Sequence, residues 1–220
     1  MSPLRLRYQT IEFGGTDIHV RSLRDRQQYA DVDDVAAQLG ISSANWSLFG
    51  VVWASGELLA HLMFDHEVEG LRVLEVGCGI ALASLVLNHR LADITATDYH
   101  PEAGNFLREN VTLNNGRAIP FMRTGWGDED SGLGEFDLII GSDLLYERDH
   151  VELLSEFIDQ HAKPHCKVIL VDPGRGHHAR FSKKMVTLGY AHSQTKAENV
   201  AGLTQPLRGP FRGQVLCYQR

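Results

Sequence analysis

Residues 73–81 read Val-Leu-Glu-Val-Gly-Cys-Gly-Ile-Ala. An apolar run that ends in alternating glycines and continues with a helical pattern predicts a strand, a tight turn and a helix. Glycine lets the backbone turn sharply there and approach a ligand without interference from a Cβ atom. Many nucleotide-binding folds use such a turn, and it can also be purely structural, so the neighbouring residues have to decide between these readings.

Two carboxylates accompany the glycine turn. Glu75 stands two residues before Gly77, which is unusual in dinucleotide sites and suits a ligand carrying an amino group and a sulfonium. About twenty residues further on, a second predicted strand ends in Asp98, where a carboxylate can accept hydrogen bonds from ribose hydroxyls. Asp98 could instead cap a helix or form a turn with His100 and Pro101. Taken together, the two signals predict an adenosine-type ligand at the carboxyl ends of the strands.

From residue 71 onward, short apolar runs alternate with helical patterns, which predicts βαβ units. Strands are expected at residues 71–76, 93–98, 120–124, 136–142 and 167–171, and helices at 81–88, 101–114, 150–161 and 179–188. Residues 190–197 and 214–219 are expected to close the sheet as an antiparallel pair. The predicted fold class is α/β, with a doubly wound, Rossmann-like and mostly parallel sheet of seven strands.

An N-terminal addition precedes this core. Residues 4–13 and 17–23 read as two strands around Gly14 and Gly15, which predicts a hairpin. A short acidic helix is expected at 31–39, and a second helix at 47–64 is expected to lead into the core. We therefore expect residues 1–45 to form an extension packed on a core of residues 46–220, within a single domain overall.

Composition narrows the classes of function. The 28 acidic and 21 basic side chains give a formal charge of −7, which disfavours nucleic acid as a partner. The sequence shows no signal-peptide run and no membrane-spanning stretch, so a cytoplasmic location away from membranes is expected. Three widely separated cysteines predict reduced thiols, and the histidine pairs lack a completing ligand set, so no metal site is expected. The sequence does not indicate an oligomeric state.

The segments 75–81 and 141–146 together with Asp98 resemble the seven-strand class I methyltransferases, which use S-adenosylmethionine. Within that class the chain resembles methyltransferase family 16, the small protein-lysine methyltransferases. Their Asp-x-x-Tyr pattern is met by Asp143 and Tyr146, and their Trp-x-Ser/Gly pattern by residues 53–56. The resemblance covers residues 46–171. Residues 172–175, Asp-Pro-Gly-Arg, are further similar to the branch that methylates lysines of the electron-transfer flavoprotein β-subunit.

The sequence departs from the family pattern at two positions. Ala81 replaces a usual glycine, although its small methyl group should still permit close packing. Gly125 precedes Trp126 where family members often have aspartate, which removes the usual contact to the adenine amino group and leaves Asp128 as a substitute. Trp126 itself is expected either to contact the ligand or to belong to the core.

The resemblance implies that S-adenosylmethionine is the cofactor and that a lysine-bearing protein is the methyl acceptor. A small-molecule amine or other metabolite is the alternative acceptor. A non-catalytic cofactor-binding module and an NAD-dependent oxidoreductase are weaker alternatives, the latter because no third glycine follows Gly79. The expected cofactor-binding residues are Trp53, Glu75, Gly77, Cys78, Gly79, Asp98, Tyr99, Trp126 and Ser142.

Asp143 and Tyr146 are the expected catalytic pair, since they could orient the acceptor amine and accept its hydrogens. The alternative is that Asp143 caps the next helix and Tyr146 packs against the sheet edge. Acceptor specificity is expected to depend on the N-terminal hairpin and on loops 172–178 and 198–213.

Overall fold

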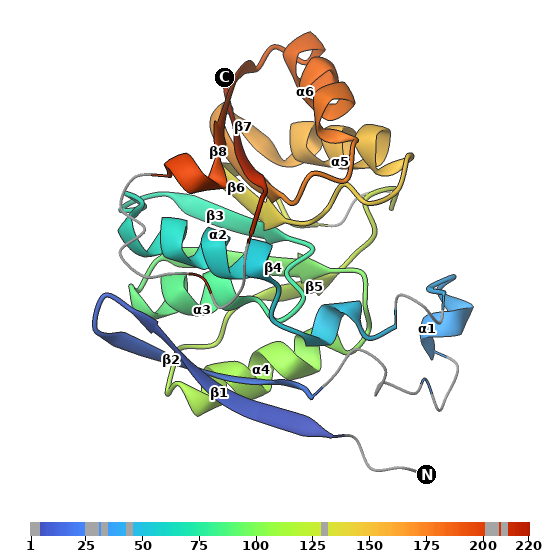
Figure 1. The fold of residues 1–220 in the computed structure, drawn as a ribbon. Helices are drawn as coiled ribbons and strands as arrows, with labels where there is room; N and C mark the ends of the chain where they lie inside the picture. Colours follow the sequence, from blue (N-terminus) through green and yellow to red (C-terminus); the bar gives the residue numbers. More distant parts are fainter. Residues whose placement is uncertain are drawn as a thin grey trace.

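The computed structural model describes residues 5–24, 31, 35–42, 46–128, 132–200, 207 and 211–220. Within these ranges seven strands form one sheet in the order β5-β4-β3-β6-β7-β9-β8 (Figure 1). The strands are β3 (Arg72–Val76), β4 (Asp93–Asp98), β5 (Phe121–Arg123), β6 (Phe136–Ser142), β7 (Ala162–Asp172), β8 (Ala191–Lys196) and β9 (Gln214–Gln219). Along this order the neighbouring strands from β5 through β4, β3 and β6 to β7 pair in parallel. β9 is antiparallel to both β7 and β8, and this arrangement confirms the predicted doubly wound sheet.

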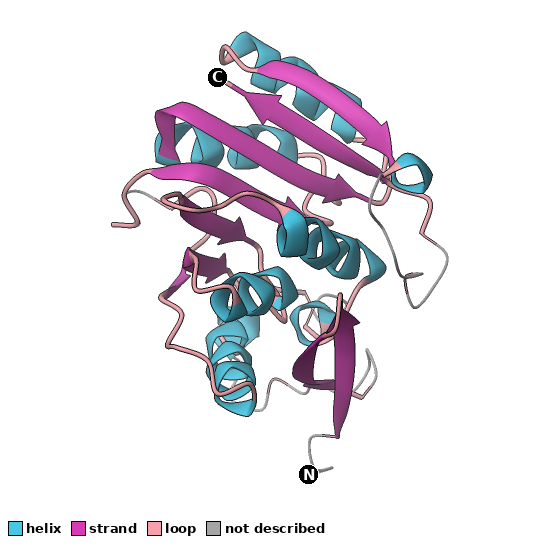
Figure 2. Cartoon of the chain, turned by 90° about the vertical axis from the view of Figure 1, so that its left-hand side faces the viewer, coloured by secondary structure: helices cyan, strands magenta, loops and turns pink. Residues whose placement is uncertain are grey.

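Helices cover both faces of this sheet (Figure 2). The core on one side contains residues of α2 (Ala54–Asp65), α3 (Leu82–His89) and α4 (Ala103–Leu113). The core on the other side contains residues of α5 (His150–His161) and α6 (His178–Thr187). Both faces of the central strands are therefore shielded from water, as their continuous apolar runs require. None of the helices in the described ranges has the length and apolar content of a membrane span.

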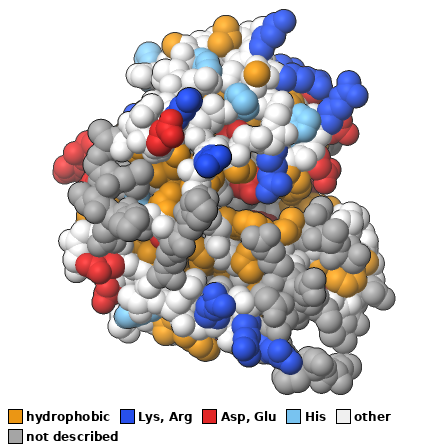
Figure 3. Space-filling model, in the orientation of Figure 1, with side chains coloured by type: hydrophobic (Ala, Val, Ile, Leu, Met, Phe, Trp, Pro, Cys, Tyr) orange, Lys and Arg blue, Asp and Glu red, His pale blue; other side chains and the backbone are white. Residues whose placement is uncertain are grey.

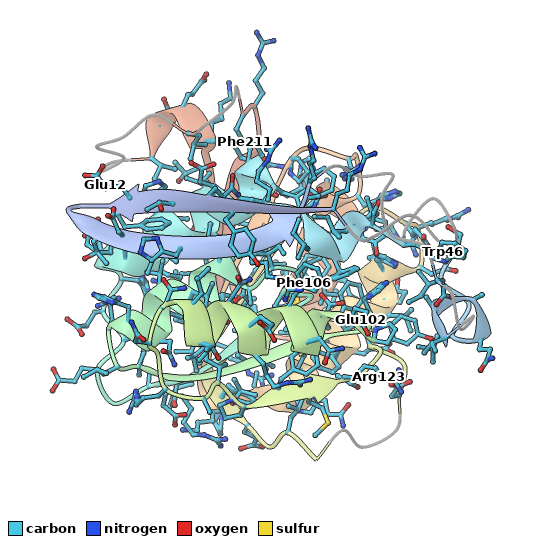
Figure 4. All side chains as sticks on the ribbon, turned by 90° about the horizontal axis from the view of Figure 1, so that it is seen from below. Glu12, Trp46, Glu102, Phe106, Arg123 and Phe211 are labelled. Atoms are coloured by element: carbon cyan, nitrogen blue, oxygen red, sulfur yellow. The ribbon has the colours of Figure 1, made fainter. Side chains whose placement is uncertain are left out.

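The N-terminal hairpin consists of β1 (Leu6–Phe13) and β2 (Thr16–Leu23), joined at Gly14 and Gly15, which both have positive φ. It lies across α4, and Figure 4 shows Phe106 of that helix between the two elements. Asn110 of α4 and Asn114, the residue that caps its C-terminus, each exchange two hydrogen bonds with the backbone of β2, at Arg21 and His19 respectively. The buried face of the hairpin shares its apolar core with α2 and α3. The boundary at residue 45 stays a prediction.

Several predicted elements match the structure to the residue, others differ from it by one or two residues, and three differ more. The bounds of β4, β6, α5 and β9 are as predicted. The single helix expected at 47–64 is wrong, because a 3₁₀ helix η1 (Leu48–Gly50) is followed by extended backbone at Val51 and Trp53 before α2 begins. The β-branched pair at positions 51 and 52 favours this extended conformation.

β7 begins five residues before the predicted strand, and α1 (Val35–Gln38) is shorter than the predicted helix. The first five residues of β7 include Lys163, Pro164 and His165, which hide the strand pattern, and the register of the β6–β7 pair shifts there. Asp31 accepts a hydrogen bond from the N–H of Ala37 at 2.7 Å and so caps the α1 turn. Residues 32–34 of the predicted helix lie outside the described residues.

Ala81, the N-cap residue that precedes α3, has a left-handed conformation, with φ 59° and ψ 38°, and its side chain is fully buried. This explains why a glycine is common at this position, since left-handed backbone costs an L-residue about 1 kcal/mol or more. The methyl group fits, as expected from the sequence.

Replacing Ala81 tests this strain. Ala81→Gly should leave the free energy of unfolding within about 1 kcal/mol of the wild type, because relief of backbone strain offsets the lost methyl group. Ala81→Val should lower it by roughly 2 kcal/mol or more, because a β-branched side chain fits neither the backbone nor the packed space. Urea denaturation measures both, and equal stability of the two variants would contradict the account.

Candidate active site

One cavity of about 890 Å³ opens at the carboxyl ends of β3, β4 and β6. It is lined by every site residue predicted from the sequence, namely Trp53, Glu75, Gly77, Cys78, Gly79, Asp98, Tyr99, Trp126, Ser142, Asp143 and Tyr146. The volume falls in the upper part of the range usual for small-molecule sites. The structure thus brings these residues together, while their roles remain predictions.

The glycine turn lies on the floor of this cavity. Gly77 and Gly79 have φ of 59° and 53°, which L-residues other than glycine rarely adopt. A Cβ atom at Gly77 would lie 2.5 Å from Leu144 Cδ2, and one at Gly79 would lie 3.0 Å from the carbonyl oxygen of Phe49. Glycine is therefore required at both positions by protein neighbours as well as by backbone conformation. Close approach of a ligand to this backbone stays a prediction.

Glu75 lines the cavity from β3 but is almost fully buried. Its Oε2 accepts hydrogen bonds from the backbone N–H of Ser84, at 2.8 Å, and from the Ser84 hydroxyl. Burial raises the pKa of Glu75 to about 7 in spite of these donors. Near neutral pH this carboxyl group is therefore poised to ionise when a cation enters the cavity.

Asp98 ends β4 on the other side of the glycine turn. Its two oxygens each accept one backbone hydrogen bond at 2.7 Å, from the N–H of Gly79 and from the N–H of His100. Burial raises the pKa of Asp98 against the opposing effect of these donors. Because a carboxylate oxygen accepts about two hydrogen bonds, the Asp98 carboxylate retains acceptor capacity for the hydroxyls of a ribose.

Asp143 follows β6 in a left-handed conformation with φ 54°, a region that aspartate tolerates better than most residues. Its carboxylate forms a bidentate ion pair with Arg175, at 2.5 Å from Nε to Oδ1 and 2.6 Å from Nη2 to Oδ2. The alternative that Asp143 caps the next helix is wrong, because α5 begins at His150 with Asp149 at its N-cap position.

Three aromatic rings meet beside Asp143. The ring of His150 makes edge contacts with Trp126, at 4.9 Å between centroids, and with Tyr146, at 4.4 Å. Nδ1 of His150 lies 2.7 Å from the carbonyl oxygen of Leu144, which fixes the ring. Partial burial and the nearby carboxylates raise the pKa of Tyr146 to about 12, so its hydroxyl keeps its proton at neutral pH.

Residues near the start of α2 and after β5 also line the cavity. Trp53 precedes α2 and its Nε1 donates to the carbonyl of Leu48 at 2.9 Å, which holds the indole at the cavity wall. Asp128, the suggested substitute for an adenine contact, lines the cavity, but its Oδ2 already accepts from the backbone N–H of Gly125 at 2.6 Å. The proposed adenine contact therefore depends on the remaining acceptor capacity of this carboxylate.

Sequence reasoning missed several lining residues. The sequence marks His150 only as the start of a helix and Arg175 only as part of a motif, yet both contact the predicted catalytic pair. Residues 40–42 of the N-terminal part also line the cavity, beside Tyr99, whose hydroxyl donates to the carbonyl of Leu39 at 2.5 Å. No local pattern marks these contacts. Of the loop at 198–213, residues 201–206 and 208–210 lie outside the described residues.

The cavity is lined by more acidic than basic side chains. Its described lining carries five carboxyl groups, those of Glu75, Asp98, Asp128, Asp143 and Glu147, against the single guanidinium of Arg175. On the face shown in Figure 3, acidic and basic side chains lie next to one another beside a band of hydrophobic side chains. An acidic, partly buried cavity with aromatic walls favours a cationic ligand.

A family model described as lysine methyltransferase matches residues 36–186. The chain belongs to this family. It is 30% identical over 169 residues to the electron transfer flavoprotein beta subunit lysine methyltransferase of Xenopus laevis, covering 72% of this chain and 65% of that protein. It is 25% identical to the calmodulin-lysine N-methyltransferase of Arabidopsis thaliana, covering 66% and 52% of the two chains.

A solved structure supports the fold of this family member. The magnesium protoporphyrin IX methyltransferase of Synechocystis PCC 6803, solved with bound SAM, superposes with a TM-score of 0.57 at 19% identity, covering 74% of this chain and 76% of that one. At this identity the likeness concerns the fold alone. The chain spans less than two thirds of the length of the two relatives described above.

The buried carboxyl of Glu75 predicts a pH-dependent stability. Between its ordinary pKa of 4.5 and about 7, the unfolded chain ionises this group while the native chain keeps the proton. The free energy of unfolding should therefore fall as pH rises through this window, by up to about 3 kcal/mol from this group. Urea denaturation at pH 5, 6 and 7.5 should show this loss for the wild type relative to Glu75→Gln. Parallel pH curves for the two proteins would refute it.

Proposed function

We propose that this chain transfers a methyl group from S-adenosylmethionine to the side-chain amine of a lysine in a protein. The observation that carries the proposal is that Asp98 and Asp143, at the carboxyl ends of the two strands that flank β3, line the same cavity. One carboxylate suits a ribose and the other an amine, so cofactor and acceptor can meet above the glycine turn. Membership of the lysine methyltransferase family supports the same reaction.

The residues present fit the cofactor. Asp98 has acceptor capacity for the ribose hydroxyls, and Glu75 lies where a carboxylate can accept from the amino group of the methionine part. Trp53 and Trp126 provide aromatic walls, which favour a cationic sulfonium. When bound, S-adenosylmethionine supplies an electrophilic methyl group for an in-line displacement.

The protein contributes mainly positioning to this reaction. A lysine amine with an ordinary pKa near ~10.4 loses its proton at neutral pH at a cost on the order of 4 kcal/mol. The Asp143 carboxylate and the oxygen of Tyr146 can accept the hydrogens of the neutral amine and so aim its lone pair into the cavity. The Trp126, Tyr146 and His150 rings pack against one another at this end of the cavity.

A protein acceptor is favoured over a small molecule by the family, whose members compared above are named for protein lysines. The formal charge of −7 supports a basic, lysine-bearing acceptor and opposes nucleic acid. The relatives' names supply two probes, the electron transfer flavoprotein β subunit and calmodulin.

The acceptor class is tested with a radiolabelled methyl donor. We expect label in a protein band when the purified chain is incubated with cell extract or with either probe protein, and loss of that label when the modified lysine is replaced by arginine. Label confined to small molecules would instead favour the alternative of a metabolite methyltransferase. Cofactor binding by calorimetry without any transfer would identify a non-catalytic binding module.

Two substitutions distinguish the role of the proposed cofactor end of the site from that of the proposed acceptor end. Asp143→Asn should lower kcat/KM about 100-fold or more while cofactor affinity stays within about threefold, because the carboxylate acts on the amine. Asp98→Asn should weaken cofactor binding about tenfold or more, because a charged acceptor for the ribose is lost. Calorimetry with the cofactor and initial-rate kinetics measure both variants. Full turnover by Asp143→Asn would remove Asp143 from the mechanism.

A further inference from the structure

Arg175 stands on a loop built to hold its position. Asp172 ends β7 with a buried side chain whose Oδ2 accepts a hydrogen bond from the N–H of Gly174 at 2.9 Å. Gly174 and Gly176 flank Arg175 with φ of 89° and 93°, and Pro173 before Gly174 suits a type II turn. The loop therefore needs glycine on both sides of Arg175, and its base is tied to the sheet.

The guanidinium of Arg175 is directed at one partner. Its Nε and Nη2 donate to the two oxygens of Asp143, which is the strongest geometry available to such a pair. The Asp143 side chain is 13% exposed and that of Arg175 is 44% exposed, so the contact lies at the cavity wall with the arginine toward water. Among the described lining residues, this is the single Lys or Arg side chain.

The pairing has a consequence for the amine that we propose as acceptor. An unpaired carboxylate beside an amine stabilises its protonated form and raises the amine pKa by roughly 1 to 3 units. An ammonium ion has no lone pair, so it cannot attack the methyl group. A carboxylate already paired with a fixed cation can still accept N–H bonds through its free lone pairs, but it no longer favours the extra proton.

We propose that Arg175 is a positioning residue that neutralises Asp143, so that the acceptor amine is held as the uncharged nucleophile rather than as an ammonium ion. This inference rests on the proposed function. The guanidinium remains charged at every pH of interest, and its pairing with Asp143 raises its pKa further. The positive charge that offsets Asp143 therefore stays constant over the pH range in which the bound amine titrates.

Other titratable groups surround this pair. From the elements around it these are Asp98 after β4, Tyr146 and Glu147 in the loop after β6, His150 of α5, Asp172 at the end of β7 and His178 of α6. All but the two histidines are acidic or neutral groups, so removal of Arg175 leaves an excess of negative charge. Removal of Arg175 should therefore raise the pKa of the bound amine whether Asp143 is considered alone or together with these neighbouring groups.

The test is the pH dependence of kcat, which reports ionisations in the enzyme–substrate complex. It compares wild type, Arg175→Met, Arg175→Lys and, as a matched control, Arg180→Met. Arg180 is a similarly exposed arginine that pairs with Glu152 at 3.1 Å outside the cavity lining. The acceptor is the probe protein labelled by the wild type, and cofactor affinity and thermal unfolding are measured for each variant.

For Arg175→Met we expect the acid limb of the kcat profile to shift by about 1 pH unit to higher pH, with kcat near pH 7 reduced about tenfold. At high pH its kcat should approach that of the wild type. Arg175→Lys should keep the wild-type limb because the charge is retained, and Arg180→Met should match the wild type throughout. Cofactor affinity should change less than about threefold in all variants.

Two results would overturn the inference alone. A uniform loss of kcat at every pH would assign Arg175 a merely structural role, and a gain of kcat near neutral pH would show that it blocks Asp143 instead. Absence of methyl transfer by the wild type would contradict the proposed function first, and this inference with it. Correct folding of the variants, shown by unchanged thermal unfolding, separates these cases from misfolding.

Discussion

The parallel pairing of β3 with β4 on one side and with β6 on the other determines where the glycine turn and the strand-end carboxylates of the cavity lie. Because the three strands run in the same direction, their carboxyl ends meet at one edge of the sheet. Glu75 and its glycines, Asp98 and Asp143 are thus brought to a common cavity although Glu75 and Asp143 are far apart in the sequence. Without this pairing the three carboxyl groups would not line the same cavity.

The central sheet could be predicted from the sequence because its strands are short, apolar and separated by clear turn signals. The bounds of β4 and β6 were predicted to the residue for this reason. The prediction of one helix at 47–64 is wrong because the near-helical spacing of its apolar residues includes Val51 and Val52, two β-branched residues that favour an extended backbone. The early start of β7 was missed because Pro164 and its polar neighbours weaken the strand pattern.

The residues of the candidate site also fall into those that local sequence marks and those that it does not. Residues at strand ends, such as Asp98 and Asp143, could be predicted because a strand end is marked by local sequence. His150 and Arg175 could not be placed, since their contacts with Tyr146 and Asp143 depend on how a helix and a loop from elsewhere in the chain approach the cavity. Tertiary contacts of this kind leave no periodic trace in the sequence.

The hairpin at the N-terminus has a practical consequence for shortened forms of the protein. Asn110 and Asn114 hold β2 by its backbone, and the inner face of the hairpin completes the apolar layer over α2 and α3. A fragment starting at residue 46 would present that layer to water, together with two asparagine side chains stripped of their partners. Such a fragment would be prone to self-association. The fold that forms the cavity therefore depends on a segment that contributes no strand to the seven-stranded sheet.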